Sequence, residues 1–377
     1  MKRVVLFSGG SACRSINIAL CRSGVEVTRI VPAWDSGGSS KVIREQLGIL
    51  SVGDIRQALM TMAHGEGCAG DVVKICNARI SANLGLEDAR KEFLFYAKGG
   101  HPLLERMEPG LHGAILNYLN TFASAVGEDF DFRHGSIGNF ILTGACLAHN
   151  GDVNTAIFVF RKLCGINGNV WPSSVDSDLV LSATLKDGRT VIPQDAITTM
   201  AKGDAKVGIA EVELDRASGE RPVANSAVLD AIARADLIAF GPGSVYTSII
   251  PHLLVDGVIA AVEQAHCPKV LIGNVLQCRE TIGLTLEGVS SAFDHHWRQH
   301  GGSSSLFSHI LANRVLFPFE KTIGEFPYLS DGLSEKAAPA LIRDEFEDAW
   351  NRGQHDGEAV AASLLKIISA EGASGHA

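Results

Sequence analysis

Residues 4–13 read Val-Val-Leu-Phe-Ser-Gly-Gly-Ser-Ala-Cys, and this stretch decides the fold class. Its four apolar residues do not alternate with polar ones, which is typical of a strand buried on both faces inside a parallel sheet. Small residues then predict a turn, helical periodicity follows over residues 16–21, and a second strand is expected over residues 25–31. This β-α-β opening predicts an α/β protein with a mostly parallel sheet.

The same order of elements returns in the second half of the chain. A strand is expected over residues 237–240, followed by a glycine-rich loop, a helix over residues 256–265 and a strand over residues 270–272. With that strand we expect the sheet to be complete or nearly so. Glycine-rich loops thus follow two apolar strands, at the carboxyl ends where open α/β sheets bind their ligands.

Two segments interrupt this pattern and one follows it. Residues 64–133 are mostly helical in periodicity and predict a helical insertion. Residues 168–215 change to a period of two and carry Asp187-Gly188, a strong hairpin signal, so they predict a small β-rich lobe. We therefore expect a nucleotide-binding domain over residues 1–300. A charged helical extension should follow over residues 301–377, with helices over residues 335–368 that form an outer pair or an oligomer contact.

Composition and charge exclude several classes of protein. The 377 residues carry a formal charge of −9, with 46% hydrophobic and 20% charged residues, which excludes a coiled coil or a disordered chain. Binding to a nucleic-acid backbone needs a concentrated basic face, and the sequence has none, so we expect no nucleic-acid partner. No apolar run approaches the roughly 18 residues of a membrane span. The N-terminus lacks a signal peptide's apolar region, and the eight cysteines form no C-x-x-C pair, so a cytoplasmic protein without a membrane partner is expected.

The strongest motif is the Gly-Pro-Gly loop, residues 241–248, which comes directly after the strand expected at residues 237–240. Two glycines let the backbone approach a ligand closely. Amides that point out of the turn, together with the Ser244, Thr247 and Ser248 hydroxyls, would form a nest for phosphate oxygens. The alternative is a tight strand-to-helix turn stabilised by serine caps.

Two further loops carry candidate ligand groups. The opening loop, residues 8–13, holds Gly9, Gly10 and Ser11 at the same kind of strand-to-helix position, although it lacks two of the three glycines of a dinucleotide fingerprint. The aspartate loop, residues 35–40, follows the second strand, and Asp54 opens a later helix. Carboxylates beside glycine amides are suited to Mg²⁺ bound to a diphosphate. Both aspartates could instead cap helices.

Residues 134–139 open an internal helix, where His134, Ser136, Gly138 and Asn139 stand near outward-pointing amides. An imidazole and a carboxamide at such a position are plausible ligand contacts. A histidine beside a cap is also a common structural feature, so the interpretation depends on the neighbouring motifs.

Taken together, these motifs resemble the CofD-like superfamily. The resemblance rests on the order and spacing of Asp35-x-Gly37-Gly38-Ser39-Ser40, Gly53-Asp54-Ile55-Arg56, His134-x-Ser136-Ile137-Gly138-Asn139 and Gly241-Pro242-Gly243-Ser244-Val245-Tyr246-Thr247-Ser248. It covers roughly residues 1–290, with Asn274 after the next strand. The superfamily contains 2-phospho-L-lactate transferase and the YvcK-type gluconeogenesis factors, which bind UDP-sugars, and the motifs are closer to the latter.

The resemblance implies a modified Rossmann-like three-layer fold and a homodimer. It also implies that Asp35 and Asp54 hold Mg²⁺ and take part in catalysis. Ser36 stands where the family has a second aspartate, the opening loop departs from the family's glycine pattern, and the segment after Asn274 is one residue shorter. Neither known branch accounts for the insertion or for the chain after residue 300. These departures favour a divergent subgroup with its own substrate.

Two hypotheses of function follow. The first is a transferase that binds a nucleoside-diphosphate-linked donor with Mg²⁺ and moves a phosphoryl-containing group to a hydroxyl acceptor. The second is a non-catalytic protein that binds a UDP-sugar and regulates a partner; a nicotinamide-dependent oxidoreductase is a weaker third. In each, the ligand is a nucleotide or nucleotide sugar. The predicted ligand contacts are Gly9, Gly10, Ser11, Gly37, Gly38, Ser39, Ser40, Arg44, Arg56, His134, Ser136, Gly138, Asn139, Gly241, Pro242, Gly243, Ser244, Tyr246, Thr247, Ser248 and Asn274.

Overall fold

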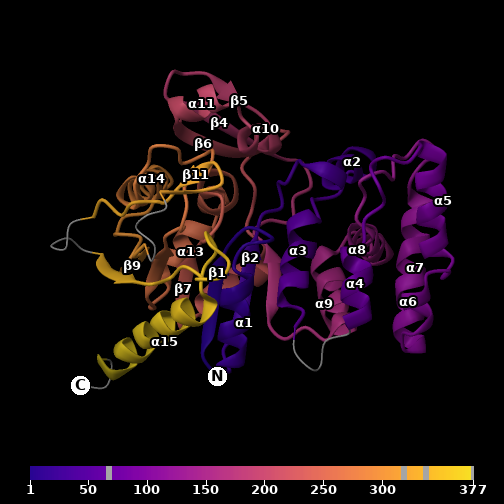
Figure 1. Ribbon diagram of the computed structural model, residues 1–377, viewed down its shortest axis with the longest axis horizontal. Helices are drawn as coiled ribbons and strands as arrows, with labels where there is room; N and C mark the ends of the chain where they lie inside the picture. Colours follow the sequence, from indigo (N-terminus) through magenta and orange to yellow (C-terminus); the bar gives the residue numbers. More distant parts are fainter. Residues whose placement is uncertain (65–69, 316–320, 334–338, 375–377) are drawn as a thin grey trace.

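The protein is described by a computed structural model over residues 1–64, 70–315, 321–333 and 339–374. Its centre is a parallel seven-stranded sheet (Figure 1). The strands are, in spatial order, β12 (Ala340–Asp344), β9 (His309–Asn313), β8 (Lys269–Ile272), β7 (Leu237–Phe240), β1 (Arg3–Phe7), β2 (Glu26–Val31) and β3 (Asn169–Pro172). All six neighbouring pairs are parallel, which confirms the α/β prediction.

The strand order reverses between β1 and β7. From β1 the chain continues outward through β2 and, after the helical insertion, β3; after residues 173–236 it returns to β7 on the other side of β1. Val4, Leu6 and Phe7 have no exposed surface, as expected for a strand covered on both faces, and Phe7 stacks on Phe240 of β7 with ring centroids 4.7 Å apart. Open α/β sheets commonly form a ligand crevice where the strand order reverses in this way.

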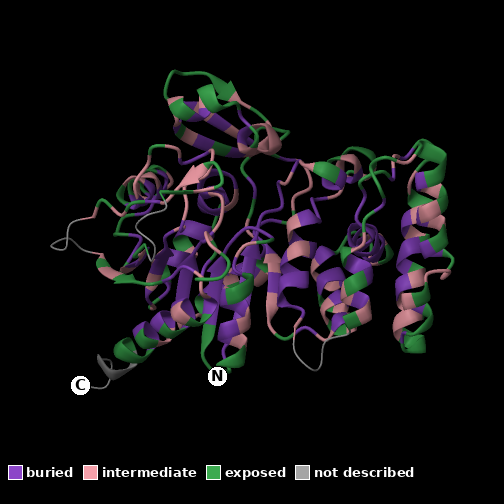
Figure 2. Ribbon diagram, in the orientation of Figure 1, coloured by how far each residue is buried: buried purple, intermediate pink, exposed green. Residues whose placement is uncertain are grey.

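Helices cover the sheet and build the insertion. The covering helices and helical turns are α1 (Arg14–Arg22), α2 (Gly38–Leu47), α3 (Gly53–Met62), α8 (Ile137–Ala148), α9 (Val153–Cys164), α12 (Ser226–Ala233), η1 (Val245–Ile249), η2 (Ile250–Leu254), α13 (Val258–Gln264), α14 (Leu286–Gln299) and α15 (Gly357–Ser374). The expected helical insertion contains α4 (Gly70–Asn77), α5 (Leu86–Ala97), α6 (Pro102–Glu105) and α7 (Pro109–Ala125). Figure 2 shows buried residues along the sheet and on the inner sides of these helices. No helix in the described ranges is long and apolar enough to cross a membrane.

The β-rich lobe stands above the sheet in Figure 1. Its antiparallel strands are β4 (Leu179–Leu185), β5 (Thr190–Val191) and β6 (Ile209–Arg216), with the short helices α10 (Gln194–Thr198) and α11 (Lys202–Val207) between them. The hairpin expected at Asp187-Gly188 joins β4 to β5. The predicted lobe boundary at residue 168 is wrong, because β3 pairs with β2 in the central sheet.

The expectation of a helical extension over residues 301–377 is also wrong. β9 and β12 extend the central sheet, and β10 (Thr322–Ile323) pairs with β11 (Phe326–Pro327). Within the range 335–368, where helices were expected, residues 335–338 lie outside the described residues, residues 340–344 form β12, and α15 begins at Gly357. β12 has only three apolar residues in a row, Ala340 to Ile342, which is too short to distinguish strand from helix by periodicity; its pairing with β9 decides the outcome.

Candidate functional site

The opening loop passes directly over the start of α3. A Cβ placed on Gly10 would lie 2.5 Å from Oδ1 of Asp54, and one placed on Gly9 would lie 3.3 Å from Oγ of Ser248. The Gly10 amide also donates a hydrogen bond to the Asp54 carboxylate. Gly243 joins the same cluster, since a Cβ there would lie 3.5 Å from the Gly9 nitrogen. The opening loop, Asp54 and the Gly-Pro-Gly loop therefore meet above β1 and β7.

A fully buried cation, Arg29 of β2, supports this loop from below. Its guanidinium donates to the Ser8 hydroxyl at 3.0 and 2.8 Å, to the Gly9 carbonyl and to the Thr61 hydroxyl at 2.6 Å. Burial lowers the pKa of Arg29, while the nearby Cys13 and Asp54 oppose that shift. A positive charge thus lies directly beneath the turn. Sequence reasoning missed it, because an arginine inside an apolar strand gives no motif.

The two predicted metal-binding aspartates lie close together. A Cβ on Gly53 would lie 2.5 Å from Oδ2 of Asp35, so the residue before Asp54 packs against the Asp35 carboxylate. Oδ1 of Asp35 accepts the Gly37 amide at 3.0 Å. Burial raises the pKa of Asp54 to about 7, and the charge of Asp35 adds to the shift, whereas the Gly10 amide, Arg29 and Arg56 counteract it.

Asp35 and Asp54 have the chemistry of Mg²⁺ ligands. Mg²⁺ is commonly held by one or two carboxylates and completes its shell with water and substrate phosphates. Asp35 and Asp54 supply that donor set. Among the described residues, no group of three or more histidine, cysteine, aspartate or glutamate side chains could hold a metal alone. The pair therefore suits a cation that arrives with a phosphate ligand.

The aspartate loop is tied to the internal helix α8. Buried Arg56 donates to Oδ1 of Asn139 at 2.8 Å, and Nδ2 of Asn139 donates to the Ser39 hydroxyl at 3.0 Å. Gly138 allows this approach, because a Cβ there would lie 2.7 Å from Cδ of Arg56. The first turn of α2 has no side-chain cap on its amides. Arg56, Asn139 and Ser39 thus form one hydrogen-bonded chain, and the Arg56 charge also acts on Asp54.

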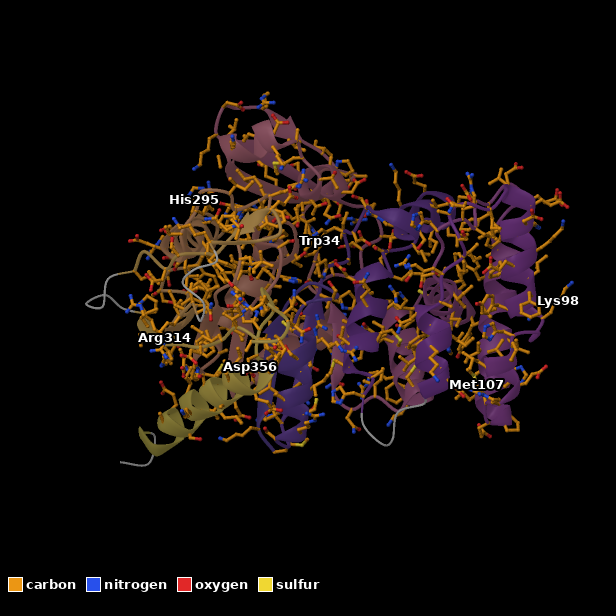
Figure 3. All side chains as sticks on the ribbon, in the orientation of Figure 1. Trp34, Lys98, Met107, His295, Arg314 and Asp356 are labelled. Carbon is orange, nitrogen blue, oxygen red and sulfur yellow. The ribbon has the colours of Figure 1, made fainter. Side chains whose placement is uncertain are left out.

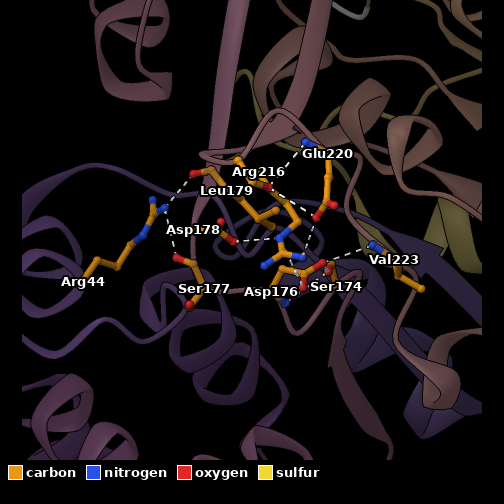
Figure 4. A network of polar contacts seen from close by, with 10 residues as sticks. Arg44, Ser174, Asp176, Ser177, Asp178, Leu179, Arg216, Glu220 and Val223 are labelled. Atoms are coloured by element: carbon orange, nitrogen blue, oxygen red, sulfur yellow. Dashed lines mark hydrogen bonds and ion pairs between the residues drawn. The ribbon is translucent and has the colours of Figure 1, made fainter.

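Arg44 and Ser36 hold the β-rich lobe instead of facing the site. The Arg44 guanidinium donates to the carbonyls of Leu179 at 2.6 Å and Ser177 at 3.4 Å (Figure 4). It also donates to the Asp35 carbonyl at 3.1 Å. The Ser36 hydroxyl donates to Asp195 of α10 at 2.9 Å and accepts its amide at 2.9 Å. The prediction that Arg44 contacts a ligand is thus not supported by its bonding. Figure 3 shows Trp34, the residue before Asp35, beneath the lobe.

His134 and Ser136 make contacts that stabilise the start of α8. His134 is exposed and has a positive φ of 62°, and its backbone bonds Ile80 and the side chain of Arg79. Ser136 is buried and donates to the Cys76 carbonyl at 3.3 Å. Both residues position the chain where it enters α8. This is the structural role that the sequence analysis gave as the alternative to ligand contact.

In the Gly-Pro-Gly loop, a carboxylate of the protein itself accepts the amides that were predicted to bind phosphate. Buried Glu280 accepts the amides of Tyr246 at 2.9 Å and Thr247 at 3.2 Å, and the Thr247 hydroxyl at 2.6 Å. Asn274 clamps Gly243, accepting its amide at 3.1 Å and donating to its carbonyl at 2.8 Å. Tyr246 and Thr247 are 4% and 1% exposed. Their amides donate to Glu280, so the prediction that they bind phosphate is wrong. Pro242 and Gly243 of the same loop line a cavity.

That cavity has a volume of about 430 Å³. The opening loop and the start of α1 form one wall through Ser11 and Arg14, and Pro242, Gly243 and Asn274 form the floor. Residues 348–355, which we name the C-terminal turn, form the opposite wall. Sequence reasoning missed this wall, because it expected helix there and found no motif. Asp54 packs against Gly10 of the same opening loop but is not among the residues that line this cavity.

Comparison with known proteins identifies the family of this chain. The family model described as 2-phospho-L-lactate transferase CofD matches residues 4–326. The chain belongs to the CofD family.

The relatives of this CofD-family chain include a gluconeogenesis factor of Listeria monocytogenes, 25% identical over 368 residues, with 97% of this chain and 95% of the relative covered. A gluconeogenesis factor of Halalkalibacterium halodurans is 28% identical over 296 residues, with 78% and 74% covered. The crystal structure of a UPF0052-family protein from Bacillus halodurans has a TM-score of 0.72 at 24% identity, with 97% and 100% covered. This likeness supports the Rossmann-like fold.

Proposed function

We propose that this CofD-family chain binds a nucleoside-diphosphate-linked donor and transfers a phosphoryl-containing group to a hydroxyl acceptor. The observation that carries the proposal is the contact between the glycine turn and Asp54. A glycine turn that lets the backbone approach closely, as in phosphate-binding loops, packs against a carboxylate whose pKa burial raises to about 7. A general base with a pKa near the working pH transfers protons most effectively.

The proposed step uses the two aspartates in different roles. The acceptor oxygen attacks the distal phosphorus of the donor, and its proton passes to Asp54. The bond between that phosphorus and the bridging oxygen breaks, and a nucleoside monophosphate leaves. Mg²⁺, when bound with the donor, would neutralise phosphate charge, with Asp35 as its ligand. Arg29 adds a positive field beneath the same turn.

Turnover and binding of Asp54→Asn test this role. Asparagine keeps an oxygen for the Gly10 amide but cannot take the proton, so product formation should fall by about 10²- to 10⁴-fold while donor affinity stays near wild type. Asp230→Asn is a matched control, because Asp230 is exposed on α12 and pairs only with Arg234 among the described residues. Unchanged turnover in Asp54→Asn would remove this residue from the mechanism.

A second candidate is a regulatory protein that binds a UDP-sugar without consuming it. The names of the relatives in Listeria and Halalkalibacterium, gluconeogenesis factors that match most of the chain, favour it. Calorimetry with UDP-glucose and with a guanosine diphosphate ester, each with Mg²⁺, separates the candidates when it is followed by mass spectrometry for product. Binding without product supports regulation, and release of a nucleoside monophosphate supports transfer.

A further inference from the structure

A second cavity, which we name the lobe cavity, lies between the β-rich lobe and α2. Its volume of about 370 Å³ is within the usual range for small-molecule sites. Lys41 and Arg44 of α2 line one wall, and residues 177–181, at the start of β4, line the other. Neither Asp35 nor Asp54 is among the lining residues, so the lobe cavity is distinct from the site proposed for transfer.

Much of the lining of the lobe cavity is apolar. Leu179 and Leu181 of β4 are buried, and Val180 between them is 37% exposed. Pro193 and Trp34 add further apolar surface, and Figure 3 shows Trp34 beneath the lobe. Such a lining favours a ligand with an apolar body, because that body leaves water when it binds.

The charged side chains of the lining leave an excess of positive charge. The Arg44 guanidinium donates to three backbone carbonyls (Figure 4), and neither Arg44 nor Lys41 forms an ion pair among the described residues. Asp178 of the opposite wall already pairs with Arg216 at 3.0 Å. Glu45 is therefore the one carboxylate left in the described lining to oppose two cations, and this balance favours a ligand with an anionic group.

We propose that the lobe cavity binds a small molecule with an apolar body and one anionic head group, such as a medium-chain carboxylate. The head group lies at Lys41 and Arg44, and the body lies against the start of β4. This site goes beyond the proposed function and does not depend on it. Arg44 also holds the Asp35 carbonyl, and Ser36 of the lining bonds Asp195 of α10. A bound molecule would thus contact the junction between the lobe and the aspartate loop.

Fluorescence titration of the full chain with anilinonaphthalene sulfonate tests the proposal, because this probe has an apolar aromatic body and one anionic group. Lys41→Gln should weaken its binding by about 2- to 5-fold, and Glu45→Gln, which removes the opposing charge, should tighten it by a similar factor. Val180→Asp should weaken binding by more than about 10-fold, since it places a like charge against the probe. All three side chains are exposed, so the melting temperatures should stay near that of wild type.

Lys162→Gln is the matched control, because Lys162 lies 5.6 Å from the ring centre of Phe158, a 49% exposed aromatic on α9. Its affinity for the probe should equal that of wild type. Octanoate should displace the probe, and octylamine, with the opposite charge, should not. The proposal is overturned if wild type does not bind the probe, if Lys41→Gln and Glu45→Gln bind it as wild type does, or if octylamine displaces it as well as octanoate. Because no nucleotide or turnover is measured, such a result leaves the proposed function standing.

Discussion

Replacing Gly10 by alanine tests the contact on which the site depends. A Cβ at this position would lie 2.5 Å from Oδ1, 2.7 Å from Cα and 2.9 Å from the carbonyl oxygen of Asp54. Two of these atoms belong to the backbone of α3 and cannot move aside as the end of a flexible side chain can. Overpacking of a close contact costs about 1–3 kcal/mol. We expect Gly10→Ala to fall at the upper end, because the loop and the helix must both shift.

Urea unfolding measures this loss, and calorimetry with inorganic pyrophosphate measures the effect on binding. Gly113→Ala in α7 is the matched control, because no atom lies within 4 Å of a Cβ there. Alanine is favoured over glycine inside a helix by about 1 kcal/mol, so this control should be at least as stable as wild type. If Gly10→Ala unfolds at the wild-type urea concentration and binds pyrophosphate equally well, the close approach of the opening loop to Asp54 is refuted.

Three further predictions concern charge and assembly. Because its folded-state pKa is raised, Asp54 keeps a proton between about pH 4 and 7 that the unfolded chain has lost. Stability should therefore fall as pH rises through this window, and Asp54→Asn should flatten that part of a stability profile; an unchanged profile contradicts the raised pKa. Glu280→Ala leaves two amides and a hydroxyl unpaired and should cost more than about 2 kcal/mol in urea unfolding, with Glu280→Gln much milder; equal effects would show that the carboxamide cannot replace the carboxylate. Light scattering should give twice the 40.0 kDa of the chain, and the mass of one chain would reject the homodimer.

The centre of the fold and much of the site could be predicted from the sequence. β1 and β7 are apolar runs followed by glycine turns, and Asp187-Gly188 marks its hairpin through local backbone preference. Asp35 follows β2 and Asp54 opens α3 after the whole of α2, so a joint role for the two was implied by the family resemblance and not by strand position.

Other features depend on contacts between distant residues. β12 is a strand because β9 offers it a partner, and the C-terminal turn reaches the cavity only because His355 bonds a carbonyl after β8. The role of Glu280 could not be predicted from the sequence either. An isolated glutamate in a loop does not indicate that it will be buried and accept the amides of Tyr246 and Thr247. Local pattern cannot reveal such long-range pairing.

The carboxylate of Glu280 also determines how the protein meets its ligand. A glycine-rich loop held only by a bound phosphate would lose its shape whenever the phosphate left, and each new encounter would have to restore the order. Here Glu280 and Asn274 hold the loop through hydrogen bonds that need no phosphate. Association then carries little entropy cost from the loop, and a ligand meets a finished surface at its first collision. Evolution could exchange the small molecule in the cavity without having to rebuild the turn beneath it.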